Sequence, residues 1–176
     1  MQRRSFLKWA INGLGVLWGA ILGVPALAFL TDARNRLAPN RGFKTVARLH
    51  DLPQGTPVQV VIRDVRNDAW TLHPNDVIGR VWLIRRPNDE VDAFTTICPH
   101  LGCSINYDKA AALFICPCHG GSFELNGHLK ANTAAKNPAP RGMDRLECRR
   151  DPTNPDFLQV KYQNFRQGET SPILKN

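Results

Sequence analysis

The sequence lacks three patterns that would assign a function quickly. It has no Cys-x-x-Cys pair, no internal repeat of architectural length and no low-complexity tract. A zinc ribbon usually arranges its cysteines in Cys-x-x-Cys pairs, so that class is disfavoured. A repeat architecture needs a fixed period, and the chain shows none. We therefore interpret the chain as one ordinary domain, with an apolar segment at its amino terminus.

Acidic residues are also few. Fifteen Asp and Glu stand against 23 Lys and Arg, which gives a formal net charge of +8 over 176 residues. Nucleic-acid binding would need basic residues gathered in a stripe with interleaved aromatics, and we find no such stripe. We therefore interpret the positive net charge as a solvated basic surface that meets an acidic partner.

The amino-terminal sequence MQRRSFLKW predicts an export signal. Two arginines are followed by Ser, Phe, Leu and Lys, which is typical of twin-arginine signals. The next 22 residues, from Trp9 to Leu30, are apolar apart from Asn12. At helical rise they are long enough to span a bilayer core. We predict a signal and transmembrane anchor over residues 1–30, with cleavage after Ala26-Leu27-Ala28 as the alternative.

The arginines before this segment predict its orientation. Positive charge favours the cytoplasmic side of a membrane. A single pass through a bacterial cytoplasmic membrane would then place the amino terminus in the cytoplasm and the rest of the chain on the periplasmic side. Residues 31–42 (TDARNRLAPNRG) are polar and contain Pro39 and Gly42, which predicts a flexible linker. Continuation of the helix through Asn35 is the alternative.

Residues 43–176 predict an all-β domain. Short runs of β-branched and aromatic residues alternate with turn formers, which is typical of an antiparallel sandwich or open barrel. The strands that we predict cover residues 46–49, 58–62, 80–85, 91–96, 113–115, 143–148 and 157–162. The expected fold is therefore an all-β domain that follows one transmembrane helix.

Two short boxes organise this domain. The first is CPHLGC at residues 98–103, and the second is CPCHGGSF at residues 116–123. Each box offers one cysteine and one histidine as metal ligands, namely Cys98 with His100 and Cys116 with His119. A set of two thiolates and two imidazoles suits zinc, and it also suits one form of [2Fe–2S] cluster.

Each box contains a second cysteine, Cys103 in the first and Cys118 in the second. A disulfide between them would staple the two loops together, and export to an oxidising compartment would permit it. The fifth cysteine, Cys148, lies on a predicted strand. We expect it to be a small buried apolar residue.

The paired boxes resemble those of Rieske iron–sulfur proteins, specifically the disulfide-bearing kind in cytochrome bc-type quinol oxidoreductases. The resemblance covers nearly the whole chain, and the sequence NPAP at residues 137–140 is similar to the proline loop that covers the cluster in that family. It implies a Rieske fold with a cluster-binding subdomain at about residues 97–141. The implied cofactor is one [2Fe–2S] cluster, with Cys98 and Cys116 on one iron, His100 and His119 on the other, and a Cys103–Cys118 disulfide.

The resemblance also implies a function. The chain would be the electron-transfer subunit of a quinol:cytochrome c oxidoreductase, which is an enzyme as a complex and not as an isolated chain. With His100 or His119 as the catalytic contact, it would take one electron and a proton from quinol bound against a cytochrome b-type subunit. It would pass the electron to a cytochrome c-type haem, and the linker would allow that movement within a dimeric complex.

The histidine ligands have physical consequences for such a cluster. Two neutral imidazoles in place of two thiolates make the cluster less negative, so its reduction potential rises above that of all-cysteine ferredoxins. The metal also favours a deprotonated imidazole, and reduction weakens that effect. Uptake of an electron is therefore coupled to uptake of a proton.

Two positions depart from the family pattern. Many quinol-oxidising relatives carry Ser and Tyr where this chain has Gly121 and Phe123. Hydroxyl donors at these positions would stabilise the reduced cluster, so their absence should lower the potential. This predicts menaquinol as the quinol, although Ser122 is another possible source of a hydroxyl. Pro99 also removes a backbone N–H where relatives often carry Thr, with no effect that we can assign.

The glycines of the boxes and Leu101 carry further expectations. Gly102, Gly120 and Gly121 predict tight turns whose backbone N–H groups face the sulfurs. Leu101 either shields the cluster, as the resemblance implies, or is an ordinary core leucine.

Three other functions stay open. The small subunit of an exported molybdenum oxidase, such as an arsenite oxidase, can share the signal and the boxes, but the long anchor and linker disfavour it. A Rieske ferredoxin or oxygenase component would be cytoplasmic and would lack the second cysteine of each box. A structural zinc domain is the non-redox alternative, and optical and EPR spectra would distinguish it.

Overall fold

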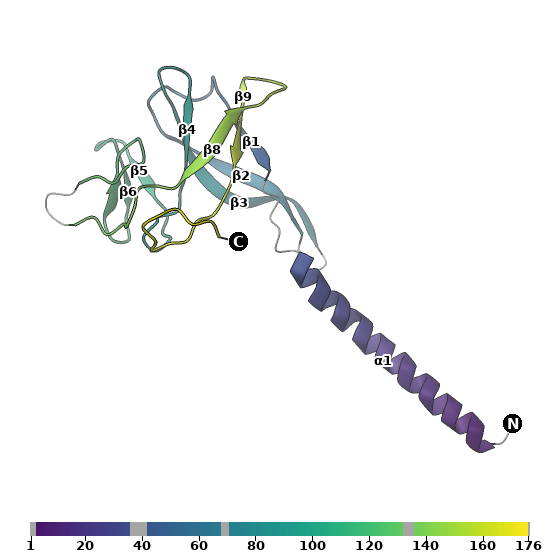
Figure 1. Cartoon of the computed structure of the whole chain (residues 1–176). Coiled ribbons are helices and arrows are strands. Elements are labelled where there is room, and N and C mark those ends of the chain that lie inside the picture. The colour runs from purple at the N-terminus through teal and green to yellow at the C-terminus, as the bar shows by residue number, and fades with distance from the viewer. Residues whose placement is uncertain (1–2, 36–41, 68–70, 132–135, 176) are drawn as a thin grey trace. The chain divides into compact units, whose positions relative to one another are not determined.

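The computed structural model of the protein describes residues 3–35, 42–67, 71–131 and 136–175 (Figure 1). Contacts between Cα atoms divide the chain into two units. One unit contains a long amino-terminal helix, and the other contains two antiparallel β-sheets. We call the second unit the head.

The helix α1 spans Arg3–Asn35 and contains Pro25. The stretch from Arg3 to Thr31 contains an 18-residue window with a mean hydropathy of 2.0, and the helix is long and apolar enough to cross a membrane. The predicted apolar helix is confirmed, but it continues five residues beyond Leu30. The start of the predicted linker is therefore helical, as in the alternative that we considered, and residues 36–41 lie outside the described residues.

The larger sheet of the head contains six strands in the order β1-β9-β8-β4-β3-β2. Their bounds are Phe43–Arg48 for β1, Val58–Asn67 for β2, Leu72–Arg85 for β3, Val91–Thr95 for β4, Arg145–Arg150 for β8 and Phe157–Lys161 for β9. The smaller sheet contains β5 (Asn106–Asp108), β6 (Leu113–Cys116) and β7 (Gly121–Phe123) in sequence order. The prediction of an all-β domain is confirmed.

The strand pattern differs from our prediction at several points, including the end of β2, which continues to Asn67 and not only to residue 62. The three-residue strands β5 and β7 were not predicted, because each is too short for its side chains to show an alternation. Strand β3 also begins eight residues earlier than expected, through Pro74, Asn75 and Asp76. These residues usually break strands, and pairing with the neighbouring β2 overrides that tendency.

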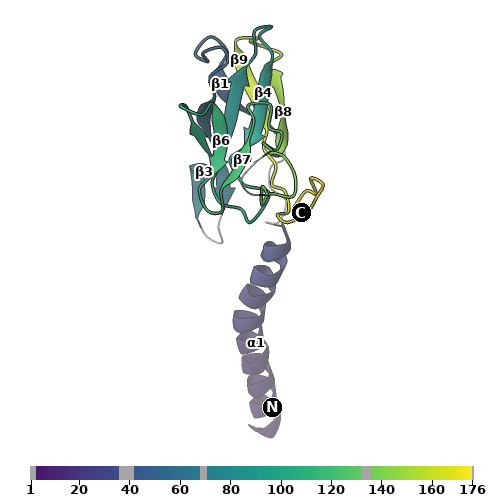
Figure 2. The same ribbon diagram turned by 90° about the vertical axis from the view of Figure 1, so that its left-hand side faces the viewer.

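Strand β3 lies between two hydrophobic cores. Val81 and Leu83 belong to the first core, with Leu158 and Val160 of β9. Trp82 and Ile84 belong to the second core, which lies under the small sheet. Since successive side chains of a strand point to opposite faces, all four residues of β3 are buried. Figure 2 looks onto the small sheet, with β4 and β8 of the large sheet behind it.

An ion pair joins the two ends of the large sheet. Strands β1 and β2 are the first and last in the strand order, yet Lys44 Nζ of β1 lies 2.8 Å from Asp64 Oδ1 of β2. The sheet must therefore curl until its two edge strands approach each other. The result is a nearly closed barrel around the first core, and both side chains of the pair are largely buried.

This pair predicts a pH dependence of stability. The hydrogen bond from Lys44 lowers the pKa of Asp64 below its ordinary value of 3.8. A lowered acid pKa stabilises the fold at every pH above the unfolded value, and that stability is lost as the pH falls through the folded value. Asp64→Asn should therefore lower the free energy of unfolding by about 1 kcal/mol at pH 7. The difference from the native protein should shrink below pH 3.8.

Urea unfolding of the full chain, followed by circular dichroism at pH 7, 5 and 3, measures this difference. Glu147→Gln serves as the control, because Glu147 is exposed and lies 3.8 Å from Lys161. An exposed pair of this kind contributes little. A difference for Asp64→Asn that stays constant down to pH 3 would contradict the closing role of the pair.

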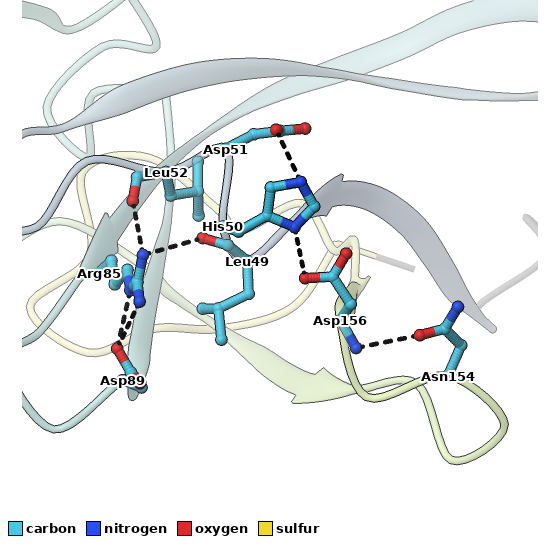
Figure 3. Close-up of polar contacts among 8 residues, drawn as sticks. All are labelled: Leu49, His50, Asp51, Leu52, Arg85, Asp89, Asn154 and Asp156. Carbon is cyan, nitrogen blue, oxygen red and sulfur yellow. Dashed lines mark hydrogen bonds and ion pairs between the residues drawn. The ribbon is translucent and has the colours of Figure 1, made fainter.

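A second polar cluster fixes the turn after β1 (Figure 3). Arg85 of β3 donates from Nη1 to the carbonyl oxygens of Leu49 (3.4 Å) and Leu52 (3.2 Å), and it pairs with Asp89. Next to it, the exposed His50 contacts Asp156 through Nδ1 at 2.7 Å. The hydrogen bond with His50 lowers the pKa of Asp156.

Replacing Arg85 should therefore destabilise the head. Arg85→Met removes charge-assisted donors from two backbone carbonyls, which should lower the free energy of unfolding by about 2–3 kcal/mol. Arg86→Met is the matched control, because Arg86 pairs only with Asp92 through its side chain in the described structure and Asp92 keeps Arg145. We expect a loss below about 1 kcal/mol for the control. Equal urea midpoints for the two variants would show that the carbonyl contacts are unimportant.

Candidate metal centre

The first box forms a tight loop after β4. Ile97 bridges Ser104, and the Cys98 N–H donates to the Cys103 carbonyl oxygen at 2.8 Å. The Gly102 N–H closes the loop on the Cys98 carbonyl oxygen at 2.9 Å. Gly102 has φ of +85°, a left-handed conformation that glycine adopts without strain.

The second box forms the turn between β6 and β7. Its Gly120 N–H donates to the Cys116 carbonyl oxygen at 3.1 Å, and Gly120 has φ of +72°. In both boxes a left-handed glycine therefore lies four residues after the predicted ligand cysteine. The N–H groups of Gly102 and Gly120 close these turns by donating to carbonyl oxygens.

The two predicted cysteine ligands lie in the second core. Cys98 is 1% exposed and Cys116 is 2% exposed. Burial, together with a smaller contribution from the neighbouring Cys116 thiol, raises the pKa of the Cys98 thiol to about 11. The backbone N–H groups of His100 and Leu101 act in the opposite direction. Backbone N–H groups of the first turn therefore face the Cys98 sulfur, as we expected, and they favour its thiolate form.

The two predicted histidine ligands lie nearer the surface. His119 is exposed and His100 is half-buried. Their ring centroids are 4.9 Å apart, with an angle of 76° between the ring planes. Leu101 is 65% exposed, which excludes a role as a core leucine. The two thiols therefore lie on the buried side of the site, and the two imidazoles lie on its solvent side, beside the exposed Leu101.

The predicted disulfide is present. Cys103 and Cys118 are bonded, and their Cα atoms are 6.5 Å apart. This disulfide joins the two loops that carry the four predicted ligands. Cys148 has a free thiol and packs against the first core as an apolar residue, although it is only partly buried and we expected it to be buried. Burial, and then the charge of Asp92, raise the pKa of Cys148 to about 11.

The spacing of the donor atoms distinguishes the candidate metals. Among the described residues, the only group of three His, Cys, Asp or Glu donor atoms within 4.8 Å of one another consists of Cys103, Cys116 and Cys118. Two of these three form the disulfide. The four predicted ligands therefore do not converge on one point, as a tetrahedral zinc site requires. Two buried thiols and two outer imidazoles fit a cluster with two irons.

The predicted proline loop lies against the second box. The Asn137 side chain donates from Nδ2 to the carbonyl oxygens of Ser122 (2.6 Å) and Lys130 (3.2 Å). Its Oδ1 accepts a hydrogen bond from the Ala139 N–H at 3.1 Å, and Ala139 belongs to the second core. Asn137 therefore fixes the loop to β7, a role that the sequence did not indicate.

Strand β7 settles which side chains can face the cluster site. Gly121 and Phe123 are buried, whereas Ser122 between them is half-buried. Because strand side chains alternate, the Ser122 side chain points away from the face shared by Gly121 and Phe123. Ser122 is therefore a poor substitute for a hydroxyl at either of those positions.

Fold and donor set together define a class of protein: a small β-domain that carries two thiols and two imidazoles on two disulfide-linked loops. The Rieske [2Fe-2S] domain family matches residues 42–152, which is more than half of the chain. The chain belongs to this family, and its cofactor is a [2Fe–2S] cluster.

Curated relatives are subunits of electron-transfer complexes. The chain is 28% identical over 130 residues to the menaquinol:cytochrome c reductase iron–sulfur subunit of Bacillus subtilis strain 168, covering 72% of this chain and 75% of the relative. The corresponding subunit of Geobacillus thermodenitrificans is 27% identical over 147 residues, covering 80% and 83%. The cytochrome b6-f complex iron–sulfur subunit of Chlorobaculum tepidum is 25% identical over 133 residues, covering 73% and 62%.

Among solved structures, the plasma membrane Rieske protein of Synechocystis PCC 6803 has 25% identity and a TM-score of 0.44, covering 68% of this chain and 99% of that one. A quaternary ammonium Rieske monooxygenase has 20% identity and a TM-score of 0.47, and the matched region covers 32% of that chain.

Proposed function

We propose that Cys98 and Cys116 hold one iron of the cluster and that His100 and His119 hold the other. The chain is then the electron-transfer subunit of a membrane quinol:cytochrome c oxidoreductase. Its partners are a cytochrome b-type subunit, which binds the quinol, and a cytochrome c-type haem, in a dimeric complex. The Bacillus and Geobacillus relatives, named as menaquinol:cytochrome c reductase subunits, support this assignment.

The separation of thiols and imidazoles is the observation that carries the proposal. Cys98 and Cys116 are buried, whereas His119 is exposed and its ring lies 4.9 Å from that of His100. When bound, the cluster supplies a one-electron acceptor at this site. A ring nitrogen that does not bind iron can accept a hydrogen bond from the quinol hydroxyl and then hold its proton. The exposed Leu101 offers an apolar contact for the quinol ring.

The rest of the chain supports a membrane position for this chemistry. The α1 helix is apolar and long enough for a single pass. A twin-arginine signal would export the head already folded, with its metal centre assembled. The arginines before the helix favour a cytoplasmic amino terminus and a periplasmic head, in a bacterial cytoplasmic membrane. In this proposal the head moves from the quinol site to the haem.

Isolation of the tagged full chain from its native membranes tests the proposed function. We expect haem b and haem c to copurify with it, and we expect the preparation to transfer electrons from menaquinol to cytochrome c. Cys116→Ala should abolish that transfer, whereas Cys148→Ala should retain it. Copurification of molybdenum without haem b would contradict the proposal and favour the small subunit of a molybdenum oxidase.

A further inference from the structure

The C-terminal segment from Asn164 to Lys175, which we call the strap, folds back on itself. Phe165 bridges Leu174, and the Arg166 N–H donates to the Ile173 carbonyl oxygen at 2.8 Å. Phe165 is buried in the first core, which fixes the start of the strap. In Figure 1 the yellow strap returns from β9 toward the side of the head where β5 and β6 lie.

The strap contacts the first box at two points. The Gly168 N–H donates to the Pro99 carbonyl oxygen at 2.8 Å. The Gln167 Cγ lies 3.6 Å from the point where a Cβ of Gly102 would be. Gln167 is itself held, because its Nε2 donates to the Phe165 carbonyl oxygen at 2.9 Å and its Oε1 accepts from Lys175 Nζ at 2.7 Å. The strap thus contacts the turn on both sides of His100.

A buried guanidinium fastens the strap from its other side. Arg141, which directly follows the proline loop, forms a bidentate pair with the buried Asp144 at 2.8 Å. It also donates to the carbonyl oxygens of Glu169 (2.6 Å) and Arg166 (2.9 Å). These two carbonyls flank the residues that contact the first box. Because charge-assisted hydrogen bonds of buried groups are strong, the strap has little freedom to move away.

We propose that the strap is a positioning element for the first box, with Arg141 as its anchor. The Gly168 contact holds the Pro99 peptide, and Pro99 directly precedes His100. Orientation of the His100 ring therefore depends on a segment 68 residues further along the chain. Loosening the strap should change the ligand geometry of the cluster and hasten its loss. This inference concerns cluster retention and does not depend on which quinol the complex oxidises.

Two glycines provide a matched test. Gly168 and Gly55 both have positive φ (+78° and +70°), and neither has an atom within 4 Å of an added Cβ. Each also donates its N–H at 2.8 Å to a carbonyl of another segment, Gly168 to Pro99 and Gly55 to Arg85. A valine at either position would suffer the same backbone strain. Only Gly168→Val would pass that strain to the first box.

The readouts are the EPR spectrum of the reduced full chain and the rate at which a chelator removes the cluster. For Gly168→Val we expect shifted g-values and loss about tenfold faster than in the native protein. Gly55→Val should keep the native spectrum and rate. Native behaviour of Gly168→Val, or equal changes in both variants, would overturn the proposal.

Gln167→Ala provides a second test that does not strain the backbone, in case Gly168→Val fails to fold. It removes the side chain that covers Gly102 and should shift the g-values in the same direction by a smaller amount. Gln59→Ala, at an exposed position of β2, is its control and should leave the spectrum unchanged. A native EPR spectrum for Gln167→Ala would contradict a role of the strap in positioning.

Discussion

Gly121→Ser is expected to raise the midpoint potential of the cluster by about 50–100 mV, the equivalent of one good hydrogen bond to a charged acceptor. The structure leaves room for the new side chain. A Cβ at Gly121 would lie 3.6 Å from Cys116 Cβ and 3.6 Å from Asn137 Oδ1, both ordinary contacts. The hydroxyl would then be close to the sulfur of Cys116, a proposed ligand, where donating a hydrogen bond would stabilise the reduced cluster.

Gly121→Ala is the matched control, because it adds the same Cβ without the hydroxyl. We expect its potential to stay close to the native value in a redox titration followed by EPR. Phe123→Tyr should raise the potential further when it is combined with Gly121→Ser, since both residues share the buried face of β7. Equal potentials for the serine and alanine variants would mean that the hydroxyl donates to Asn137 Oδ1 instead of the sulfur.

Removal of the disulfide should have a large effect on retention of the cluster, although it leaves the four proposed ligands in place. Cys103→Ser combined with Cys118→Ser opens a link between residues 15 positions apart. The chain-entropy estimate for such a loop is about 3 kcal/mol of unfolding free energy. A loss of that size corresponds to roughly hundredfold faster release of the cluster. Decay of the visible absorbance in the presence of a chelator measures this rate.

Cys148→Ala is the control for the disulfide variant. It removes a cysteine that is neither a predicted ligand nor part of the disulfide. In the native protein, the Cys148 thiol should react slowly with iodoacetamide, because burial raises the pKa of this thiol to about 11. We expect native cluster retention for this variant. Native retention by the doubly substituted protein would show that the loops hold the cluster without the disulfide.

The sequence predicted the parts of this protein that are local in the chain. Residue type and short spacing indicate a metal site in the boxes, and their resemblance to Rieske boxes implies the [2Fe–2S] cluster and the disulfide between the two extra cysteines. The apolar run before residue 31 identifies the helix in the same way. Its end was predicted too early, because the polar residues 31–35 can extend a helix that is already formed.

The parts that could not be predicted depend on contacts between distant residues. Lys44 and Asp64 join two edge strands that only the complete sheet brings together. Gly168 reaches Pro99 because Phe165 and Arg141 fix the strap at two other points. Neither partner of such a pair shows a local pattern that indicates the other. The roles of the His100 and Leu101 N–H groups likewise follow from loop geometry and not from residue type.

The midpoint potential of the full chain as a function of pH tests the central claim most directly, because histidine ligation and the missing hydroxyls both affect it. We expect a potential well below +300 mV, the upper end of the Rieske range. At alkaline pH it should fall by about 59 mV per pH unit for each proton coupled to the electron. A potential near +300 mV would contradict the low-potential assignment, and a potential independent of pH would contradict histidine ligation.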